Sequence, residues 1–170
     1  MNRIAVIGNA GGGKSTLCRQ LSRTLGVPAY AIDQIQWEPG WTPAPHEKVK
    51  RQHDHILAQE RWIIDGWGSF DLIEARFRAA DTIIFVDLPL ATHYWWTLKR
   101  QVACIFTPRE DGPEGCPMLP MTGTLLKMIW RIHWRLRPVL LKLVNSFQAE
   151  KRIIHITSPR ELRAFNGNLE

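Results

Sequence analysis

Residues 8–16 read Gly8-Asn9-Ala10-Gly11-Gly12-Gly13-Lys14-Ser15-Thr16 and fit the Walker A pattern G-x-x-x-x-G-K-[ST] without a mismatch. The apolar run of residues 3–7 before this stretch is typical of a buried parallel strand. After it, leucines at 17, 21 and 25 mark one face of a helix. Glycine lets backbone N–H groups converge on an anion, and the helix directs its free N–H groups at the same anion. The whole stretch is therefore predicted to hold the phosphates of a nucleotide.

Two side chains of this loop have expected roles in phosphate chemistry. Lys14 is expected to reach the β- and γ-phosphates as a point charge, and the Ser15 hydroxyl to ligate Mg²⁺. The alternative is a glycine-rich turn with an incidental lysine. The strand before the loop and the helix after it favour the phosphate site.

The 170 residues are expected to form one domain with its own core. The net charge of +6 suits anionic ligands but does not choose among nucleotides, nucleic acids and lipid head groups. Three cysteines at unrelated spacings favour a reducing compartment over a disulfide framework. The apolar run before Gly8 is too short for a signal peptide, and no apolar stretch is long enough to span a bilayer. We therefore expect a cytoplasmic protein.

Further apolar runs at residues 29–32, 62–64, 82–86 and 152–156 alternate with helical patterns. This alternation predicts an α/β fold with a parallel sheet covered on both faces. Two segments interrupt the pattern. Residues 37–45 form a proline-rich loop that leads into a polar helix at about 46–59, and residues 106–117 are rich in turn formers and charge. A loop of that second kind is often a lid.

These features resemble a known group of proteins. The Walker A loop, Asp33 at the end of the second strand, and the segments 61–66 (Arg-Trp-Ile-Ile-Asp-Gly) and 81–89 resemble nucleoside-monophosphate-kinase-type P-loop proteins. Trp37-x-Pro-Gly-Trp41, residues 61–66 and residues 158–165 (Ser-Pro-Arg-Glu-Leu-Arg-Ala-Phe) are similar to the bacterial adenylate-kinase-like "DNA topology modulation" (FlaR-type) family, over essentially the whole chain.

The resemblance implies a three-layer α/β sandwich with a five-stranded parallel sheet. Its core would comprise residues 1–35, 61–103 and 123–170, with a helical acceptor-binding insert at about 36–60 and a lid at about 104–122. ATP and Mg²⁺ are the implied cofactors.

Two strand-terminal aspartates are candidate site residues. The resemblance implies that Asp33 contacts the acceptor or orients an attacking hydroxyl, and the alternative is an N-cap or turn carboxylate. Asp65 resembles the strand-terminal acid that helps to position Mg²⁺ beside Ser15, often through water, and the alternative is a turn cap. Ala31 stands where many related kinases have the first aspartate of Asp-x-Asp, which argues against a shikimate-type acceptor. A third aspartate, Asp87, is expected only to cap the next helix.

Arginines are expected around the transferring phosphoryl group because their planar fork matches its oxygens. Arg100 ends the helix of residues 95–101 and is expected to flank the adenine or reach the phosphates. Arg109, within the lid, is expected to close over the γ-phosphate. Arg131 belongs to a basic stripe with Lys127 and Arg135, for which a solvated face is the alternative. We expect Arg100 and Arg131 to act in catalysis and Arg100 and Arg109 to bind the nucleotide.

The expected acceptor pocket lacks an arginine clamp. Adenylate kinase has Asp-Gly-Phe-Pro-Arg where this chain continues from Asp65-Gly66 to Trp67, and no arginine occurs between Asp33 and Arg51. Aromatic residues are available instead, which makes an aromatic or apolar acceptor at least as plausible as a nucleoside monophosphate. Core packing is the alternative for Trp37 and Trp41, and it is the expected role of Trp62, Trp130 and Trp134.

The remaining reactive residues receive structural roles. The lid offers Cys104 and Cys116 without a Cys-x-x-Cys pair, so we expect free thiols rather than a zinc site. Ser158 and Glu161 fit a capping box for the last helix. His53 and His55 receive no role.

The sequence thus predicts an ATP-binding, Mg²⁺-dependent phosphotransferase that moves the γ-phosphate of ATP to an unidentified small acceptor. The alternative is a non-enzymatic or weakly ATP-hydrolysing regulator associated with DNA topology. Nucleic acid is a less favoured partner, because no DNA-reading motif occurs. Association of residues 130–144 with a membrane surface is also considered, and core packing is preferred for that segment.

Overall fold

Five short apolar runs form one parallel sheet. They are β1 (Arg3–Gly8), β2 (Ala29–Ala31), β5 (Trp62–Asp65), β6 (Thr82–Val86) and β7 (Arg152–Ile156), in the order β2-β5-β1-β6-β7. Every neighbouring pair is parallel. The computed structural model describes residues 1–106 and 112–167. It confirms the predicted α/β fold with a five-stranded parallel sheet.

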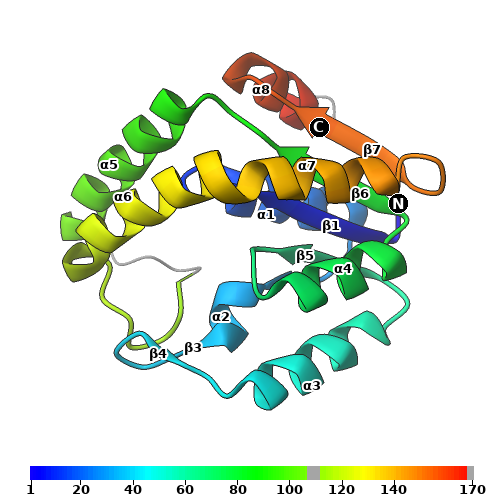
Figure 1. Cartoon of the computed structure of the whole chain (residues 1–170), viewed down its shortest axis with the longest axis horizontal. Coiled ribbons are helices and arrows are strands. Elements are labelled where there is room, and N and C mark those ends of the chain that lie inside the picture. The colour runs from blue at the N-terminus through cyan, green and yellow to red at the C-terminus, as the bar shows by residue number, and fades with distance from the viewer. Residues whose placement is uncertain (107–111, 168–170) are drawn as a thin grey trace.

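Helices cover both faces of this sheet, because side chains alternate across each strand. Ile4 and Val6 of β1 pack against α1 (Lys14–Leu25) and α8 (Pro159–Gly167). Ala5 and Ile7 point the other way, into a second cluster with α3 (His46–Leu57), α4 (Phe70–Ala79) and α7 (Arg137–Ser146). Figure 1 shows α7 in front of the sheet and α1 behind it. The fold is therefore a three-layer sandwich.

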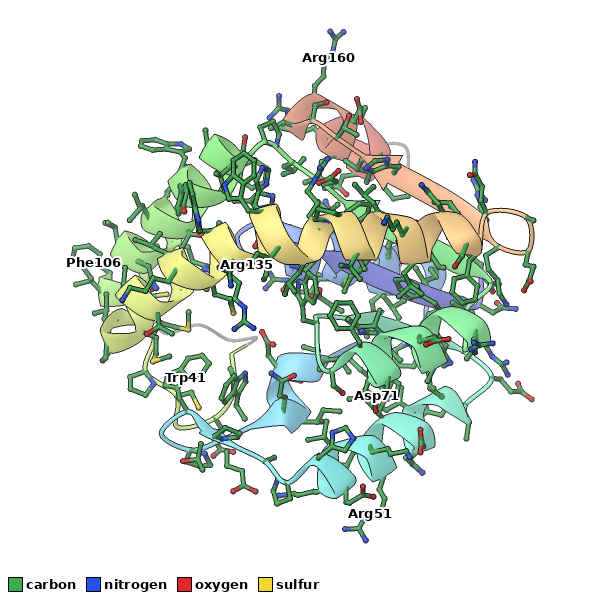
Figure 2. The ribbon with its side chains drawn as sticks, viewed as in Figure 1. Trp41, Arg51, Asp71, Phe106, Arg135 and Arg160 are labelled. Atoms are coloured by element: carbon green, nitrogen blue, oxygen red, sulfur yellow. The ribbon has the colours of Figure 1, made fainter. Side chains whose placement is uncertain are left out.

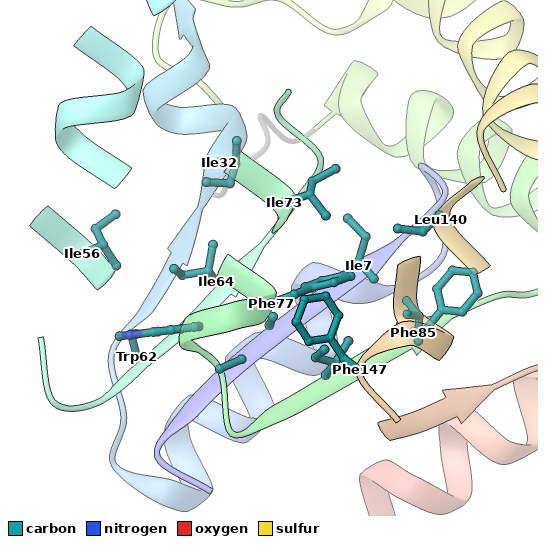
Figure 3. Close-up of a cluster of buried hydrophobic side chains, with 14 residues drawn as sticks. Ile7, Ile32, Ile56, Trp62, Ile64, Ile73, Phe77, Phe85, Leu140 and Phe147 are labelled. Atoms are coloured by element: carbon teal, nitrogen blue, oxygen red, sulfur yellow. The ribbon is translucent and has the colours of Figure 1, made fainter. Parts of the chain in front are cut away.

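The second cluster contains the large aromatic residues of the core (Figure 3). Phe77 of α4 meets Phe147 edge to face at 6.0 Å between ring centroids. Trp62 is fully buried, as predicted. These contacts fix the middle of the sheet, and the loops at the carboxyl ends of its strands then lie on a rigid platform.

Some element boundaries differ from prediction. β2 ends at Ala31, so Ile32 and Asp33 begin the short helix α2 (Ile32–Gln36) instead of closing the strand. The helix predicted at about 46–59 ends at Leu57. The helix before the expected lid is α5 (Leu90–Phe106), and residues 104–106 are therefore helical.

The two interruptions of the pattern lie against one another. In the first, β3 (Trp37–Glu38) and β4 (Thr42–Pro43) form an antiparallel hairpin. In the second, the described residues lead through the 3₁₀ turn η1 (Leu119–Met121) to α6 (Thr122–Arg131). Gly40 N–H donates to the Gly115 carbonyl at 3.0 Å, and Trp41 Nε1 donates to the Pro117 carbonyl at 2.8 Å. These bonds join the hairpin to the segment that we expected to be a lid.

The expectation that Trp130 and Trp134 pack in the core is wrong. Both side chains are exposed, on α6 and on the π-helical segment η2 (Ile132–Leu136) that joins α6 to α7. The buried residues of α6 and η2 are Ile129 and Ile132, which lie on a different side of the helix.

Asp87 does not have the predicted capping role. Its carboxylate accepts hydrogen bonds from Arg137 Nε and Nη2 at 2.6 and 2.8 Å and from His155 Nε2 at 3.1 Å. Burial alone raises the pKa of Asp87, but the bonds from Arg137 and His155 outweigh it and the pKa is lowered. This ionised carboxylate ties the start of α7 to β6 and β7.

Other structural expectations are confirmed. Cys18, Cys104 and Cys116 form no disulfide, as expected. Ser158 Oγ accepts from Glu161 N–H at 3.2 Å, while the Glu161 carboxylate accepts from Thr157 N–H at 2.8 Å. The last helix is therefore capped much as a capping box requires.

His53 makes stability depend on pH. It is fully buried on α3, and burial lowers its pKa to about 4 from 6.5. Between these values the unfolded chain binds the proton that the folded chain excludes, so acidification from about pH 6.5 to pH 4 should destabilise the fold. Each such histidine contributes about 1.4 kcal/mol per pH unit. In urea unfolding measured across this range, His53→Gln should reduce the slope by that amount. His55→Gln, on the exposed side of the same helix, should leave it unchanged.

Candidate functional site

The Walker A loop lies at the carboxyl edge of the sheet, beside a cavity of about 620 Å³. Residues 10–16 line this cavity, whereas Gly8 and Asn9 are not among its lining residues. The other walls come from distant elements of the chain: α2 and the hairpin, the turn after β5, α5, η1 and α6. The fold thus brings both predicted inserts to the phosphate loop.

The glycines of the loop are required by its shape. Gly11 and Gly13 have φ values of +69° and +77°, which residues with a Cβ rarely adopt. A Cβ on Gly11 would lie 2.2 Å from Thr97 Oγ1. Lys14 is nearly buried, and its Nζ donates to the Asn9 carbonyl across the loop at 2.8 Å. The backbone is therefore held in the curved form that exposes N–H groups to an anion.

Hydrogen bonds to three later parts of the chain support this loop. Trp67 Nε1 donates to the Gly8 carbonyl at 2.8 Å, and His93 Nδ1 lies 2.9 Å from the Ala10 carbonyl. Asn9 extends the support to α6, because its Nδ2 donates to the Ile129 carbonyl at 2.9 Å. Gly8 and Asn9 thus fix the loop through hydrogen bonds, although neither residue lines the cavity.

His93 is buried on α5, and burial lowers its pKa to about 4. The ring is therefore neutral near pH 7. Because a carbonyl oxygen only accepts, the proton lies on Nδ1. Nothing in the spacing of the sequence indicated this contact, since His93 and Ala10 are 83 residues apart.

Trp67 is itself positioned by Arg76 of α4. This arginine is fully buried, and its Nη2 donates to the Trp67 carbonyl at 2.8 Å. Burial lowers its pKa to about 10, and the nearby charge of Asp65 opposes that shift. The guanidinium therefore remains charged at neutral pH beneath the turn that follows β5.

Ser15 and Asp65 form an oxygen pair at the cavity. Ser15 Oγ donates to Asp65 Oδ2 at 2.8 Å. Asp65 is buried, and its Oδ1 has no hydrogen-bond partner within the described residues. A buried carboxylate oxygen without a partner is costly unless it ligates a cation or a water molecule. A hydroxyl and a carboxylate are the hard oxygen ligands that Mg²⁺ prefers, so these residues fit the metal predicted for them.

The predicted acceptor and arginine residues are only partly brought together. Asp33, in the first turn of α2, and Arg100, on α5, both line the cavity. Arg131 is exposed at the end of α6 and, like Arg135, is not among the lining residues. Arg109 lies outside the described residues.

Sequence reasoning did not single out Arg19, which also lines the cavity. It follows Ser15 by four residues, and the helical repeat places such residues on one side of a helix. This spacing was the available signal.

The end of the cavity away from the phosphate loop is aromatic and apolar. Trp37 and Trp41 line it, with their rings edge to face at 5.7 Å between centroids. Trp41 has a left-handed φ of +61°, which is uncommon for a bulky residue and costs energy. Three methionines that sequence reasoning did not select also line the cavity: Met118, Met121 and Met128.

Two glycine substitutions distinguish steric collision from backbone strain. They are Gly11→Ala and Gly26→Ala. Gly26, with φ of +61°, has no atom within 4 Å of the position that a Cβ would take, so its replacement should cost about 1–2 kcal/mol of left-handed strain alone. Gly11→Ala has the same strain and adds the collision with Thr97, so it should cost more and weaken phosphate binding. Urea unfolding and equilibrium dialysis with ATP measure the two effects. Equal stability of the two variants would contradict this packing.

No protein-family model matches the chain, and no curated protein matches it either. Solved structures do. A shikimate kinase from Acinetobacter baumannii in complex with shikimate has a TM-score of 0.60 at 13% identity, covering 99% of this chain and 90% of that one. A gluconokinase from Sinorhizobium meliloti 1021 has a TM-score of 0.55 at 14% identity, covering 99% and 93%. A shikimate kinase from Bacteroides thetaiotaomicron has a TM-score of 0.52 at 16% identity, covering 99% and 96%. At these identities the likeness shows that the chain has the α/β fold of these P-loop kinases.

Proposed function

We propose that this protein is an ATP-dependent phosphotransferase that moves the γ-phosphate of ATP to a small acceptor. The carrying observation is that the Walker A loop, the Ser15–Asp65 pair and Asp33 face one cavity. A regulator that only binds nucleotide does not need a second, differently lined compartment beside the phosphates. The fold shared with small-molecule kinases supports the same proposal.

The chain's own groups suggest how the phosphates are held. Backbone N–H groups of residues 10–15 meet the phosphate oxygens, and Lys14 adds a positive charge in a nearly buried position. Ser15 and Asp65 hold Mg²⁺, which neutralises charge on the phosphates when it is bound. His93, kept neutral, holds the loop through Ala10 without adding a competing charge.

In the transfer itself, the acceptor hydroxyl oxygen attacks the γ-phosphorus, and the bond from that phosphorus to the bridging oxygen of ADP breaks. Asp33 orients the hydroxyl and accepts its proton. Arg100 stabilises the charge on the transferring group. Arg109 of the expected lid is proposed to assist, and a role for Arg131 would require α6 to turn this side chain toward the cavity.

The acceptor proposed here has an aromatic or apolar body and a hydroxyl group. Trp37, Trp41 and Met118 offer contact area rather than charge at the end of the cavity that faces the insert. Arg19 lies on the phosphate side, where its Nη2 reaches Thr16 Oγ1 at 3.4 Å. Ala31 again argues against shikimate itself.

Two finer assignments remain proposals on sequence grounds. The motifs at 37–41, 61–66 and 158–165 favour the FlaR-type family, whose link to DNA topology is the second candidate function. The free thiols favour a cytoplasmic location.

The first test is release of ADP from Mg-ATP with a panel of nucleosides, nucleoside monophosphates, shikimate and small aromatic alcohols. We expect one acceptor class to raise ADP release and to gain a phosphate, detected by mass spectrometry. Lys14→Ala should reduce this turnover about 10²- to 10³-fold by removing charge stabilisation, while the unfolding midpoint changes little. Full turnover by Lys14→Ala would contradict the proposal. A flat panel with intact ATP binding would favour the regulatory function, to be tested by salt-dependent DNA binding.

Asp33→Asn tests the acceptor side of the cavity. The amide keeps the shape of the carboxylate but cannot take a proton, so kcat with the identified acceptor should fall about 10²-fold or more while the Kd of ATP stays constant. Asp54→Asn, on the exposed side of α3, is the matched control and should behave like the parent protein. Unchanged kinetics in Asp33→Asn would remove this residue from the reaction.

A further inference from the structure

Large hydrophobic side chains are exposed mainly on one arm of the molecule. Within the described residues, most of them lie on α5, α6 and the segments that continue α6. Exposed fractions reach 82% for Phe106, 67% for Trp95, 58% for Trp134 and 55% for Trp130. Single exposed hydrophobic residues need no explanation, but a group on adjacent helices marks an interaction surface.

Helical spacing places these residues beside one another. Tyr94 Oη donates to the Leu126 carbonyl at 3.4 Å, which identifies the sides of α5 and α6 that meet. Leu98 and Ile105 follow Tyr94 by four and eleven residues, so they lie along this junction on α5. Trp130 follows Leu126 by four residues and contacts Trp134 at 5.7 Å between centroids. We call the resulting surface the outer apolar face, and its residues are Trp95, Leu98, Val102, Ile105, Phe106, Trp130 and Trp134.

This face is separate from the candidate active site. The residues of the same helices that line the cavity, among them Trp96, Arg100 and Leu125, lie on the opposite side of the helix pair. Figure 1 shows α5 and α6 together at one edge of the molecule, and in Figure 2 Phe106 points away from it. A partner bound there would leave the cavity unobstructed.

The helical segments that form the face carry charge of one sign. The four segments α5, α6, η2 and α7 contain no Asp or Glu, and all their residues are described. Their basic residues are Lys99, Arg100, Lys127, Arg131, Arg135, Arg137 and Lys142, of which Arg100 lines the cavity and Arg137 is paired with Asp87. Lys99 on α5 and Lys127 and Arg131 on α6 are exposed at the outer margins of the apolar face. Long basic side chains in such positions can extend toward anionic head groups while aromatic rings enter the interface.

From this arrangement we propose that the outer apolar face binds an anionic lipid surface. No described helix is long and apolar enough to cross a bilayer, so the binding is peripheral, with α5 and α6 lying in the plane of the interface. A second copy of this chain fits less well, because a two-fold contact would bring like charges together without an acidic partner. Nucleic acid fits less well, because the aromatic residues of the face could stack on bases but its aliphatic residues Leu98, Val102 and Ile105 cannot. The proposal does not depend on the kinase activity.

The test is sedimentation of the full chain with vesicles of phosphatidylcholine, alone or mixed with phosphatidylserine. We expect binding to the mixed vesicles, weaker binding to phosphatidylcholine alone, and loss of binding as salt is added. Tryptophan fluorescence should be quenched by brominated lipid, because the rings enter the interface.

Two variants separate the apolar and the basic contributions. Leu98→Gln with Val102→Gln and Ile105→Gln should lower the partition coefficient about tenfold or more by removing apolar contact. Lys99→Gln with Lys127→Gln should lower the partition coefficient about 30-fold on mixed vesicles only, since each basic residue near an anionic surface contributes about 1 kcal/mol. Lys50→Gln with Arg51→Gln is the matched control. Both residues are exposed on α3, and Figure 2 shows Arg51 projecting into solvent far from α5 and α6. It should bind as the parent does.

An unchanged unfolding midpoint establishes that a variant is folded. If the triple apolar variant does not fold, the variant with both lysines replaced still tests the proposal, because those lysines are exposed. Absence of sedimentation with mixed vesicles overturns the proposal. If vesicles are not bound, two other results also overturn the proposal. One is a dimer that the apolar substitutions dissociate, and the other is salt-dependent DNA binding through this face.

Discussion

The candidate site depends on how the backbone of residues 8–11 is held. Its carbonyl groups accept bonds from Trp67 and His93, and Asn9 bonds to the backbone of α6. A loop rich in glycine would otherwise sample many conformations, because glycine has little intrinsic preference. These bonds fix the loop and also place the turn after β5, α5 and α6 relative to it. The same hydrogen bonds therefore position both the phosphate loop and the walls of the cavity.

Burial sets the charge of several ionisable side chains in the core and beneath the phosphate loop. Burial keeps His93 and His53 neutral, while Arg76 stays charged and Asp65 lies within its field. The only role that we assign to His93 and Arg76 is to position the loop and Trp67. In the proposed reaction, the charge that acts on the substrates comes from Lys14, Arg100 and Asp65. The cost is sensitivity to acid, since both histidines oppose protonation in the folded state.

The arm formed by α5 to α7 links the two proposals. One side of it closes the cavity, and its far end is tied to the sheet by Asp87, Arg137 and His155. Its other side exposes aromatic and basic residues that the core does not use. The same arm therefore forms one wall of the proposed acceptor pocket and carries the proposed lipid-binding face.

Sequence alone determined the phosphate loop, the five-stranded parallel sheet and the approach of Asp65 to Ser15. The loop and the parallel sheet follow from local composition and from the alternation of strand-like and helical runs. The number of strands and the place of Asp65 beside Ser15 were implied by the resemblance of these motifs to P-loop kinases. Tertiary structure decided the support from His93 and Arg76, the ion pairs of Asp87 and the exposure of Trp130 and Trp134. Such contacts join segments far apart in the chain. The sequence pattern of an apolar helical stripe, moreover, is the same whether the stripe packs against the core or is exposed to solvent.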